Sequence, residues 1–317
     1  MINLSRFDLV SLRLYVAVVD AGSLTAGAER FGISLPAVSK RITELEQHCG
    51  VGLLIRGQRG VRATEEGQTI HRHAIEVVAR LEQLAQAADE LQSGAQGHLR
   101  LCANPSALGG FLPGVLATYA RLYPRIRIDL EDALSEDGIR AVQKGWAELA
   151  VIGDNVPDGG LDTVLCNVDR LVLLTPADHA FACRPSVQLE EALDHELVTL
   201  ARSASLTRKL AAAADAANKS VRIRVQVRSF DAMSRMVACR LGLAILPSAS
   251  AGLYATALGL AVVRLEGREV ERRLLVAMRR QAGLDVAARD FLALVSDKDN
   301  TLRGEGLPTL GPVASSG

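Results

Sequence analysis

The stretch ISLPAVSKRITELE, from Ile33 to Glu46, combines the pattern of a helix with a polar face. Ser34 is a favourable helix N-cap, and Pro36 falls in the first turn, where its missing N–H is no loss. Apolar residues recur at positions i, i+4 and i+7 and predict a buried stripe: Val38, Ile42 and Leu45. The opposite face carries short or charged side chains: Ser39, Lys40, Thr43 and Glu44. The stretch therefore predicts a short helix with a small, polar and partly basic surface.

The residues before this stretch predict two further short helices. Apolar residues at helical spacing define the first: Leu9, Leu12, Val16 and Val19. This helix stops at Gly22, and Ser23 offers an N-cap for a second helix that runs through Phe31 and is closed by Gly32. The turn Gly32–Ile33 then joins two short helices, which is a helix-turn-helix arrangement.

The residues after the stretch predict a basic hairpin. In IRGQRGVRATEEG, Ile55–Gly67, arginines alternate with glycines, as in a tight wing that lies against a phosphate backbone. Between Val38 and Arg62, the acids Glu44 and Glu46 are outnumbered by basic residues: Lys40, Arg41, Arg56, Arg59 and Arg62. The whole chain balances 36 basic against 36 acidic residues, so this excess is local.

Helix and hairpin together favour DNA binding. A helix fits the major groove when its outward side chains are short, or donate hydrogen bonds to phosphates and base edges. We expect the five basic residues to contact mostly phosphates, and Ser39 with the front of its helix to contact bases, Thr43 lying on the same polar face. The alternative is a small helical domain with an ordinary solvated face.

A long helix follows, capped by Thr64 and running to about Gln92. Its apolar residues form two series, each seven apart: Ile70, Val77, Leu84 and Leu91, with Ala74, Leu81 and Ala88 between them. This is the a/d seam of a coiled coil, and a second copy of the chain is its simplest cover. Packing on the downstream domain is the alternative. The break SGAQG, Ser93–Gly97, reads as a flexible hinge.

The rest of the chain alternates short Val/Ile/Leu-rich strands with helices, which predicts a parallel or mixed α/β sheet. We expect helices over 108–122 and from Ser135 to Gly145, and two subdomains with crossovers near residues 166 and 265. The last residues, 298–317, are rich in Gly, Pro and Ser and are expected to be disordered.

A ligand site is expected where a strand is followed by a helix, because ligands of open α/β sheets bind at the carboxyl ends of the strands. Serines stand at four such places: Ser106, Ser135, Ser203 or Ser205, and Ser229. If the subdomains face each other, these loops converge on one cleft that suits a small polar or anionic effector. The bland alternative is that the serines are only N-caps. The candidate effector site also includes neighbouring residues: Asn104, Asp154 and Phe230.

Other classes of protein find little support in the sequence. The dispersed cysteines form no CxxC pair, His71 and His73 point to different sides of one helix, and no cofactor-binding motif occurs, so we expect neither metal nor cofactor. We see no signal peptide or membrane span and expect a cytoplasmic protein. A two-lobed binding protein or enzyme, with the N-terminal helices used only for oligomerisation, is the alternative function, and it lacks an evident general base.

Four stretches of the sequence carry a family resemblance. SLTAGAERFGISLPAVSKRITELEQHCGVGLLIR and RGVRATEEG resemble the N-terminal signature of LysR-type transcriptional regulators, and GFLPGVLATYARLYPRIRIDLED and SFDAMSRMVACRLGLAILP resemble later parts of that family. The resemblance covers about Phe7 to Val295. It implies an α/β chain with a winged helix-turn-helix over 1–63, a linker and dimerisation helix over 64–93, and a two-lobed, periplasmic-binding-protein-like effector domain over 98–297. Lobe I would comprise about 98–165 and 266–297, and lobe II about 166–265.

The resemblance also implies partners and site residues. The implied partners are promoter DNA, a small-molecule effector and RNA polymerase. The implied assembly is a homodimer or homotetramer. Ser34, Pro36, Ser39 and Lys40 match the family's DNA-reading turn and helix, Arg56 and Arg59 its wing, and Ser106, Ser135 and Ser203 its effector contacts. Leu35 stands where a polar residue is usual, so its base contact would be apolar, for instance with a thymine methyl. Gly27 replaces a usual alanine, which we expect to permit a closer helix crossing.

Overall fold

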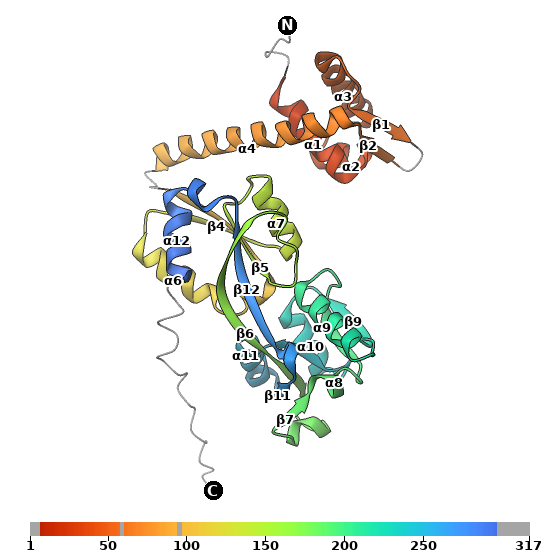
Figure 1. Cartoon of the computed structure of the whole chain (residues 1–317), viewed down its shortest axis with the longest axis vertical. Helices are drawn as coiled ribbons and strands as arrows, with labels where there is room; N and C mark the ends of the chain where they lie inside the picture. Colours follow the sequence, from red (N-terminus) through yellow and green to blue (C-terminus); the bar gives the residue numbers. More distant parts are fainter. Residues whose placement is uncertain (1–6, 58–59, 94–96, 297–317) are drawn as a thin grey trace. The chain divides into compact units, whose positions relative to one another are not determined.

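The computed structural model describes residues 7–57, 60–93 and 97–296 of the chain (Figure 1). The chain divides into two compact units, Met1–Gly94 and Ala95–Gly317, each of which is described by itself. Arg59 and the tail over 298–317 lie outside the described residues, as does most of the expected hinge.

The first unit contains the predicted helices and hairpin. The helices are α1 (Leu9–Ala21), α2 (Leu24–Phe31), α3 (Leu35–Cys49) and α4 (Glu65–Ser93), and the strands are β1 (Leu54–Gly57) and β2 (Gly60–Ala63). Two of the expected caps are confirmed: Ser23 Oγ accepts a hydrogen bond from Ala26 N at 3.3 Å, and Thr64 Oγ1 from Gly67 N at 2.9 Å. Gly22 and Gly32 end their helices in the left-handed conformation that glycine adopts without steric cost.

The core of this unit brings α1, α2 and α3 together around buried Leu14, Val18 and Ile42. The expected close crossing of α1 and α2 is confirmed at Gly27. A Cβ atom at this position would lie 2.5 Å from Cγ2 of Val18, a distance that real Cβ atoms do not reach. Only glycine fits here without displacing the buried valine.

The second unit is a mixed α/β structure with two lobes. Lobe I contains β3 (His98–Ala103), α5 (Pro105–Leu108), α6 (Leu112–Leu122), β4 (Arg127–Asp132), α7 (Ser135–Gln143), β5 (Leu149–Gly153), β12 (Glu271–Met278), η4 (Gln281–Gly283) and α12 (Val286–Ser296). Lobe II contains η2 (Ala180–Cys183), β7 (Ser186–Gln188), α8 (Leu189–Ala192), β8 (Leu197–Leu200), α9 (Ser205–Ala216), β9 (Ile223–Val227), α10 (Phe230–Ala238), β10 (Ala244–Pro247), α11 (Ser248–Leu258), β11 (Leu260–Glu266) and η3 (Arg268–Val270).

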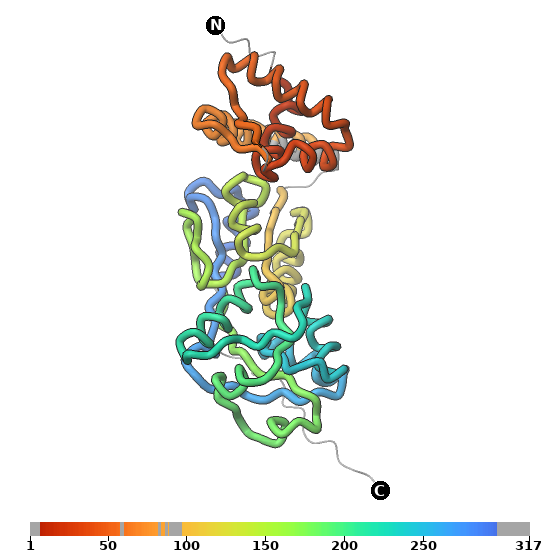
Figure 2. Tube along the Cα trace, turned by 90° about the vertical axis from the view of Figure 1, so that its right-hand side faces the viewer, coloured from red at the N-terminus to blue at the C-terminus, as the bar shows by residue number. Residues whose placement is uncertain are grey.

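One long strand, β6 (Asp162–Pro176), connects the lobes (Figures 1 and 2). Its first part pairs with β12 from Asp162 to Arg170, and its second part pairs with β10 and β11 from Leu171 onward. Strands β3, β4 and β5 run parallel in lobe I, whereas β12 is antiparallel to both β5 and β6. This is the mixed sheet that the sequence predicts.

Each lobe has its own apolar core. In lobe I, α6 and α12 pack on one face of the sheet through Tyr119 and Phe291, and α7 covers the other face through Ile139 and Val142. In lobe II the sheet and its helices enclose a separate apolar cluster that includes Phe230. Among the described residues, none of the helices is both long and apolar enough to cross a membrane.

The prediction of one helix over 108–122 is wrong at its start. Two elements, α5 and α6, replace it, and the break falls at Gly109–Gly110. A Cβ at Gly109 would lie 2.8 Å from Oγ of Ser250, and one at Gly110 would lie 2.9 Å from the carbonyl oxygen of Ser106. The two glycines therefore allow a close approach of backbone that a continuous helix would not.

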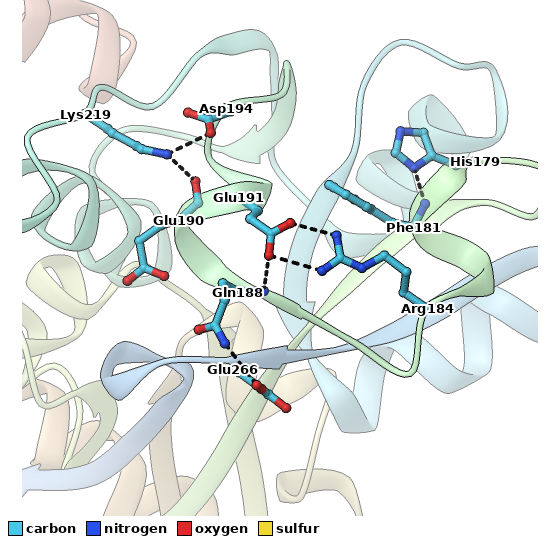
Figure 3. Close-up of polar contacts among 9 residues, drawn as sticks. All are labelled: His179, Phe181, Arg184, Gln188, Glu190, Glu191, Asp194, Lys219 and Glu266. Atoms are coloured by element: carbon cyan, nitrogen blue, oxygen red, sulfur yellow. Dashed lines mark hydrogen bonds and ion pairs between the residues drawn. The ribbon is translucent and has the colours of Figure 1, made fainter.

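The outer end of lobe II carries a network of exposed ion pairs (Figure 3). Arg184 donates to both carboxylate oxygens of Glu191, with distances of 2.7 and 3.2 Å. Nearby, His179 caps η2 by accepting a hydrogen bond at Nδ1 from Phe181 N (3.1 Å). Exposed pairs of this kind contribute little to stability.

Candidate DNA interface and effector site

Helix α3 presents the polar face that the sequence predicts. Its apolar stripe is fully buried, while Ser34, Leu35 and Pro36 at its start and Lys40 and Thr43 further along are exposed. Ser34 occupies the N-cap position, but its side chain makes no capping hydrogen bond. The hydroxyl of Ser34 is therefore not engaged by the helix that it begins.

A direct contact connects the hairpin to this face. Arg56, on β1, donates from Nη1 to Oγ of Ser39 on α3, at 2.9 Å. Glu46 fixes the segment between them, because its carboxylate accepts hydrogen bonds from the backbone N–H groups of Leu53 (2.8 Å) and Leu54 (3.1 Å). Sequence reasoning counted Glu46 only as an acid that reduces the local charge, since its role depends on how the chain turns back.

The wing consists of β1 and β2 in antiparallel register, with Ile55 opposite Arg62 and Arg56 opposite Val61. Arg56 and Arg62 are both exposed. The wing is anchored to the α1–α2 turn, because Val61 N donates to the carbonyl oxygen of Gly22 at 2.9 Å. Of the predicted wing arginines, Arg59 lies outside the described residues.

The side chain of Arg41 contacts the start of α1. Its guanidinium donates to Oγ of Ser11 at 3.3 Å and lies 3.5 Å from the carboxylate of Asp8, both at the start of α1. The expectation counted Arg41 with the phosphate-contacting residues by charge alone. These contacts join α3 to α1.

The predicted seam along α4 divides into two parts. Ala74 is buried and Ile70 half-buried, and both pack against the core of their own unit. Further along, Val77, Leu81 and Leu84 are exposed, by 44%, 38% and 65%. Ala88 is exposed as well, and the side chain of Leu91 lies outside the described residues. The second half of the helix thus carries an uncovered apolar face.

In the second unit, a row of hydrogen bonds runs along the strand ends of lobe I. Asn104 follows β3, and its Nδ2 donates to Oγ of Ser135 at 3.4 Å. The same Ser135 hydroxyl accepts from Gly153 N, at the end of β5, at 3.2 Å. All three residues are buried. Ser135 does not cap its helix, because Leu134 occupies the N-cap position, and its hydroxyl joins the strand ends. Its expected contact with a ligand stays a prediction.

Lobe II meets this row through the start of α9. Ser205 is buried, and a Cβ at Gly153 would lie 2.9 Å from its Oγ. Asn155, just after β5, donates from Nδ2 to the carbonyl oxygen of Ser205 at 2.8 Å. Arg208 donates from Nη1 to Glu136 on α7, at 2.5 Å. The two lobes therefore contact each other at the predicted loops.

A buried arginine stands beside the row. Arg272, on β12, is 1% exposed, and its Nη1 donates to Oγ of Ser106 at 2.9 Å. It pairs across the sheet with Asp169 on β6, and its Nε lies 4.0 Å from the Asp169 carboxylate. Burial lowers the pKa of Arg272 and raises that of Asp169, and the attraction between the two opposes both shifts.

The remaining predicted effector residues lie outside the hydrogen-bonded row. Ser203 and Asp154 are exposed, and Phe230 is buried in the apolar core of lobe II. Ser229 caps α10 by accepting a hydrogen bond from Ala232 N at 3.2 Å, so for this serine the capping alternative is confirmed. Sequence reasoning missed Arg272 and Asp169. Alternating burial along β12 is the only signal that distinguishes Arg272 from exposed Arg273.

Among the residues that the structure describes, no group of three or more His, Cys, Asp or Glu side chains is placed to hold a metal ion. The polar groups that do converge belong to the two regions above. One is an exposed helix face beside a basic hairpin, and the other is a buried hydrogen-bonded row where two lobes meet.

Comparisons with known proteins agree with this arrangement. The chain matches the family described as "Bacterial regulatory helix-turn-helix protein, lysR family" over residues 9–68 and the "LysR substrate binding domain" over residues 92–299. It is 29% identical over 297 residues to the uncharacterized HTH-type transcriptional regulator YfeR of Shigella flexneri, which covers 93% of this chain and 96% of that protein.

Solved structures share the fold. Full-length CbnR complexed with its target DNA aligns with a TM-score of 0.61 and 18% identity, covering 91% of this chain and 99% of CbnR. The regulatory domain of Synechocystis CcmR, in complex with 2-PG, aligns with a TM-score of 0.59 and 19% identity, covering 65% of this chain and 99% of that domain. The two family matches and the relative YfeR support a regulator and give no support to the enzyme alternative. The chain belongs to the LysR family of DNA-binding transcriptional regulators, with a helix-turn-helix domain followed by an effector-binding domain.

Proposed function

We propose that this regulator places α3 in the major groove of promoter DNA while the wing follows the phosphate backbone. The observation that carries the proposal is the exposed face of α3, opposite its buried stripe, with Arg56 of the wing bonded to Ser39 on that face. The bond holds a basic strand beside the helix that would read the bases. CbnR, which shares the fold, was solved with its target DNA.

The residues on this face divide by chemistry. Ser34 and Ser39 carry short hydroxyls suited to base edges, and Leu35 offers an apolar contact to a thymine methyl. Lys40, Arg56 and Arg62 carry charges that suit phosphates, which fix register without reading sequence. Arg59 lies outside the described residues, and only the sequence assigns it to the phosphate-contacting group.

We further propose that a small effector binds between the lobes, at the row formed by Asn104, Ser135 and Gly153 and at the neighbouring Ser106. Support comes from the burial of these polar groups and from the contacts of both lobes around them. A ligand bound there stabilises one arrangement of the two lobes relative to another. This change alters how the DNA-bound protein bends its operator and contacts RNA polymerase. The CcmR regulatory domain was solved with the small molecule 2-PG. Binding to promoter DNA implies a cytoplasmic place of action.

Lys40→Ala tests the DNA interface. Each phosphate contact releases counterions, so its removal lowers the slope of log K against log salt concentration by about one unit. We expect Lys40→Ala to weaken binding to all duplexes about equally and to flatten the slope by that amount, in fluorescence anisotropy titrations over a range of salt concentrations.

Arg121→Ala is the matched control, because it removes one exposed positive charge from α6 in the other unit. The control should leave affinity and slope unchanged. A Lys40→Ala variant with the wild-type slope would show that α3 does not lie against the DNA backbone as proposed.

A further inference from the structure

Two contacts hold strand β1 of the wing against α3, one at each end of the strand. At its start, Oε1 of Glu46 accepts hydrogen bonds from the backbone N–H groups of Leu53 (2.8 Å) and Leu54 (3.1 Å). At its other end, Arg56 Nη1 donates to Ser39 Oγ at 2.9 Å. Ser39 and Glu46 are about two helical turns apart and so lie on the same side of α3. The strand therefore runs along one side of the helix and is bonded to it at two points.

The Glu46 contact orders the short segment that leads from α3 into the wing. Leu53 is fully buried, and Glu46 is the acceptor that the structure gives to its N–H group. A carboxylate makes charge-assisted hydrogen bonds to backbone N–H groups, and these are stronger than neutral ones. Glu46 thus determines where β1 begins relative to α3.

A separate contact keeps the wing attached when the Glu46 contact is lost. Val61 on β2 donates from its backbone N to the carbonyl oxygen of Gly22 at 2.9 Å, and all four residues of β2 pair with β1. The side chain of Val61 is buried in the core of the unit. Removal of the Glu46 carboxylate therefore leaves the hairpin on the core but releases the start of β1, so that α3 no longer determines where the exposed Arg56 lies.

Electrostatic repulsion alone would give Glu46 the opposite effect on DNA binding. A carboxylate repels phosphates, so the removal of an acid from a DNA-binding surface is expected to strengthen binding. The loss of a residue that orients the wing weakens binding instead, because Arg56 is then less often placed to contact its phosphate. The sign of the change in affinity separates these two effects.

We infer that Glu46 is a positioning residue for DNA binding: it makes no contact with DNA, and by holding β1 on α3 it places the Arg56 guanidinium beside the DNA-reading face. The inference rests on the proposed function, in which α3 enters the groove and the wing follows the phosphates. It gives an acidic side chain a favourable effect on binding to a polyanion. Glu44, two residues earlier, differs, because its carboxylate is exposed and lies 3.9 Å from the Lys40 ammonium group.

Fluorescence anisotropy titration of the full chain with the duplex just upstream of its gene, over a range of salt concentrations, tests the inference with two variants. Glu46→Ala and Glu46→Gln remove the same charge, but only glutamine keeps an oxygen that accepts hydrogen bonds. We expect Glu46→Ala to weaken binding by about tenfold, the equivalent of one charged hydrogen bond, and to lower the salt slope by about one unit. Glu46→Gln should bind more tightly than Glu46→Ala and keep the wild-type slope.

Glu29→Ala is the matched control, because it removes one exposed negative charge from α2 in the same unit. This variant should bind no more weakly than the wild type. The salt slope distinguishes positioning from a general loss of folded protein, since a smaller folded fraction lowers the apparent affinity by the same factor at every salt concentration. Because Glu46 acts through Arg56, the double variant Glu46→Ala with Arg56→Ala should bind about as weakly as Arg56→Ala alone.

Four results would overturn the inference: wild-type or tighter binding by Glu46→Ala, weaker binding by Glu46→Ala with an unchanged slope, binding by Glu46→Gln no tighter than that by Glu46→Ala, or additive losses in the double variant. If Arg56→Ala weakens binding and lowers the slope while one of these results is obtained, the inference on Glu46 fails and the proposed function stands. If the wild type binds no duplex, the proposed function fails as well.

Discussion

Gly27 shows how one residue can reverse an expectation from helix propensity. Glycine destabilises a helix interior by about 1 kcal/mol relative to alanine, so alanine should be favoured in α2. The structure leaves no room for the extra atom, because its Cβ would lie 2.5 Å from Cγ2 of Val18, a stiff and fully buried side chain. Packing in the core therefore outweighs propensity at this position.

We predict that Gly27→Ala destabilises the DNA-binding unit by about 1–3 kcal/mol, the usual cost of overpacking. Urea unfolding followed by circular dichroism measures the change. Gly114→Ala is the control, since Gly114 lies in α6 with no atom within 4 Å of the position of an added Cβ, and it should stabilise the protein by up to about 1 kcal/mol. Stabilisation by both substitutions would contradict the packing argument.

His179 gives lobe II a pH dependence. Burial lowers its pKa, the nearby His195 lowers it further, and Asp178 opposes these effects. The folded protein then binds fewer protons here than the unfolded chain, so this contribution to stability is complete above the ordinary histidine pKa of about 6.5 and is lost as pH falls through the lower folded value. The Nδ1 atom accepts from Phe181 N, which requires it to be unprotonated (Figure 3).

We therefore predict that His179→Asn reduces the loss of unfolding free energy between neutral and mildly acidic pH. Asparagine keeps an acceptor for the helix cap and does not titrate in this range. Urea unfolding at a series of pH values gives the slope. If the variant lost stability on acidification as steeply as the wild type, the pH dependence would come from a titratable group other than His179.

At the scale of the element, α4 serves two purposes along its length. The first part completes the core of the DNA-binding unit through Ala74 and Val78. The second part leaves Val77, Leu81 and Leu84 exposed, which is an unusual arrangement for three large apolar side chains on one helix face. We propose that a second copy of the chain covers this face, as the seven-residue spacing predicts.

Leu81→Glu should break the dimer, because the packed seam would bury two like charges without partners. Sedimentation velocity at micromolar concentration distinguishes dimer or tetramer from monomer. Gln68→Glu adds the same charge at an exposed position on the opposite face of α4, outside both seven-residue series, and should leave the assembly intact. A Leu81→Glu variant that sediments like the wild type would exclude this face as the main contact between copies.

Strand register explains what sequence reasoning missed within elements. Arg272 and Arg273 look alike in the sequence, but successive side chains of a strand face opposite sides, so one is buried beside Ser106 and the other is exposed. Ser135 and Ser229 look alike as well. One joins two strand ends and the other caps a helix, a difference that depends on which strands lie side by side.

For the whole molecule, the sequence predicted what local patterns control. The three short helices, their caps, the hairpin and the mixed sheet follow from periodicity, capping residues and glycines. Contacts between distant segments were not predictable in this way: Arg56 reaches Ser39, Arg41 turns to α1, and Arg272 meets Ser106 across 166 residues of chain. Polar residues predicted at the strand ends, Asn104 and Ser135, do lie together, but Arg272 beside Ser106 was not predicted.

The division into two units separates two tasks. The first unit holds the surface proposed to meet DNA, and the second holds the buried polar row proposed to meet the effector. Each unit has an apolar core of its own, so substitutions on the DNA surface need not disturb the effector domain.

Binding of the purified, full-length protein to the DNA just upstream of its own gene, compared with a random duplex and titrated against salt, tests the central claim most directly. We predict tight and specific binding with a steep salt slope, because several phosphates would be neutralised by Lys40 and the wing arginines. Absent or salt-insensitive binding to any duplex would contradict the proposed DNA interface.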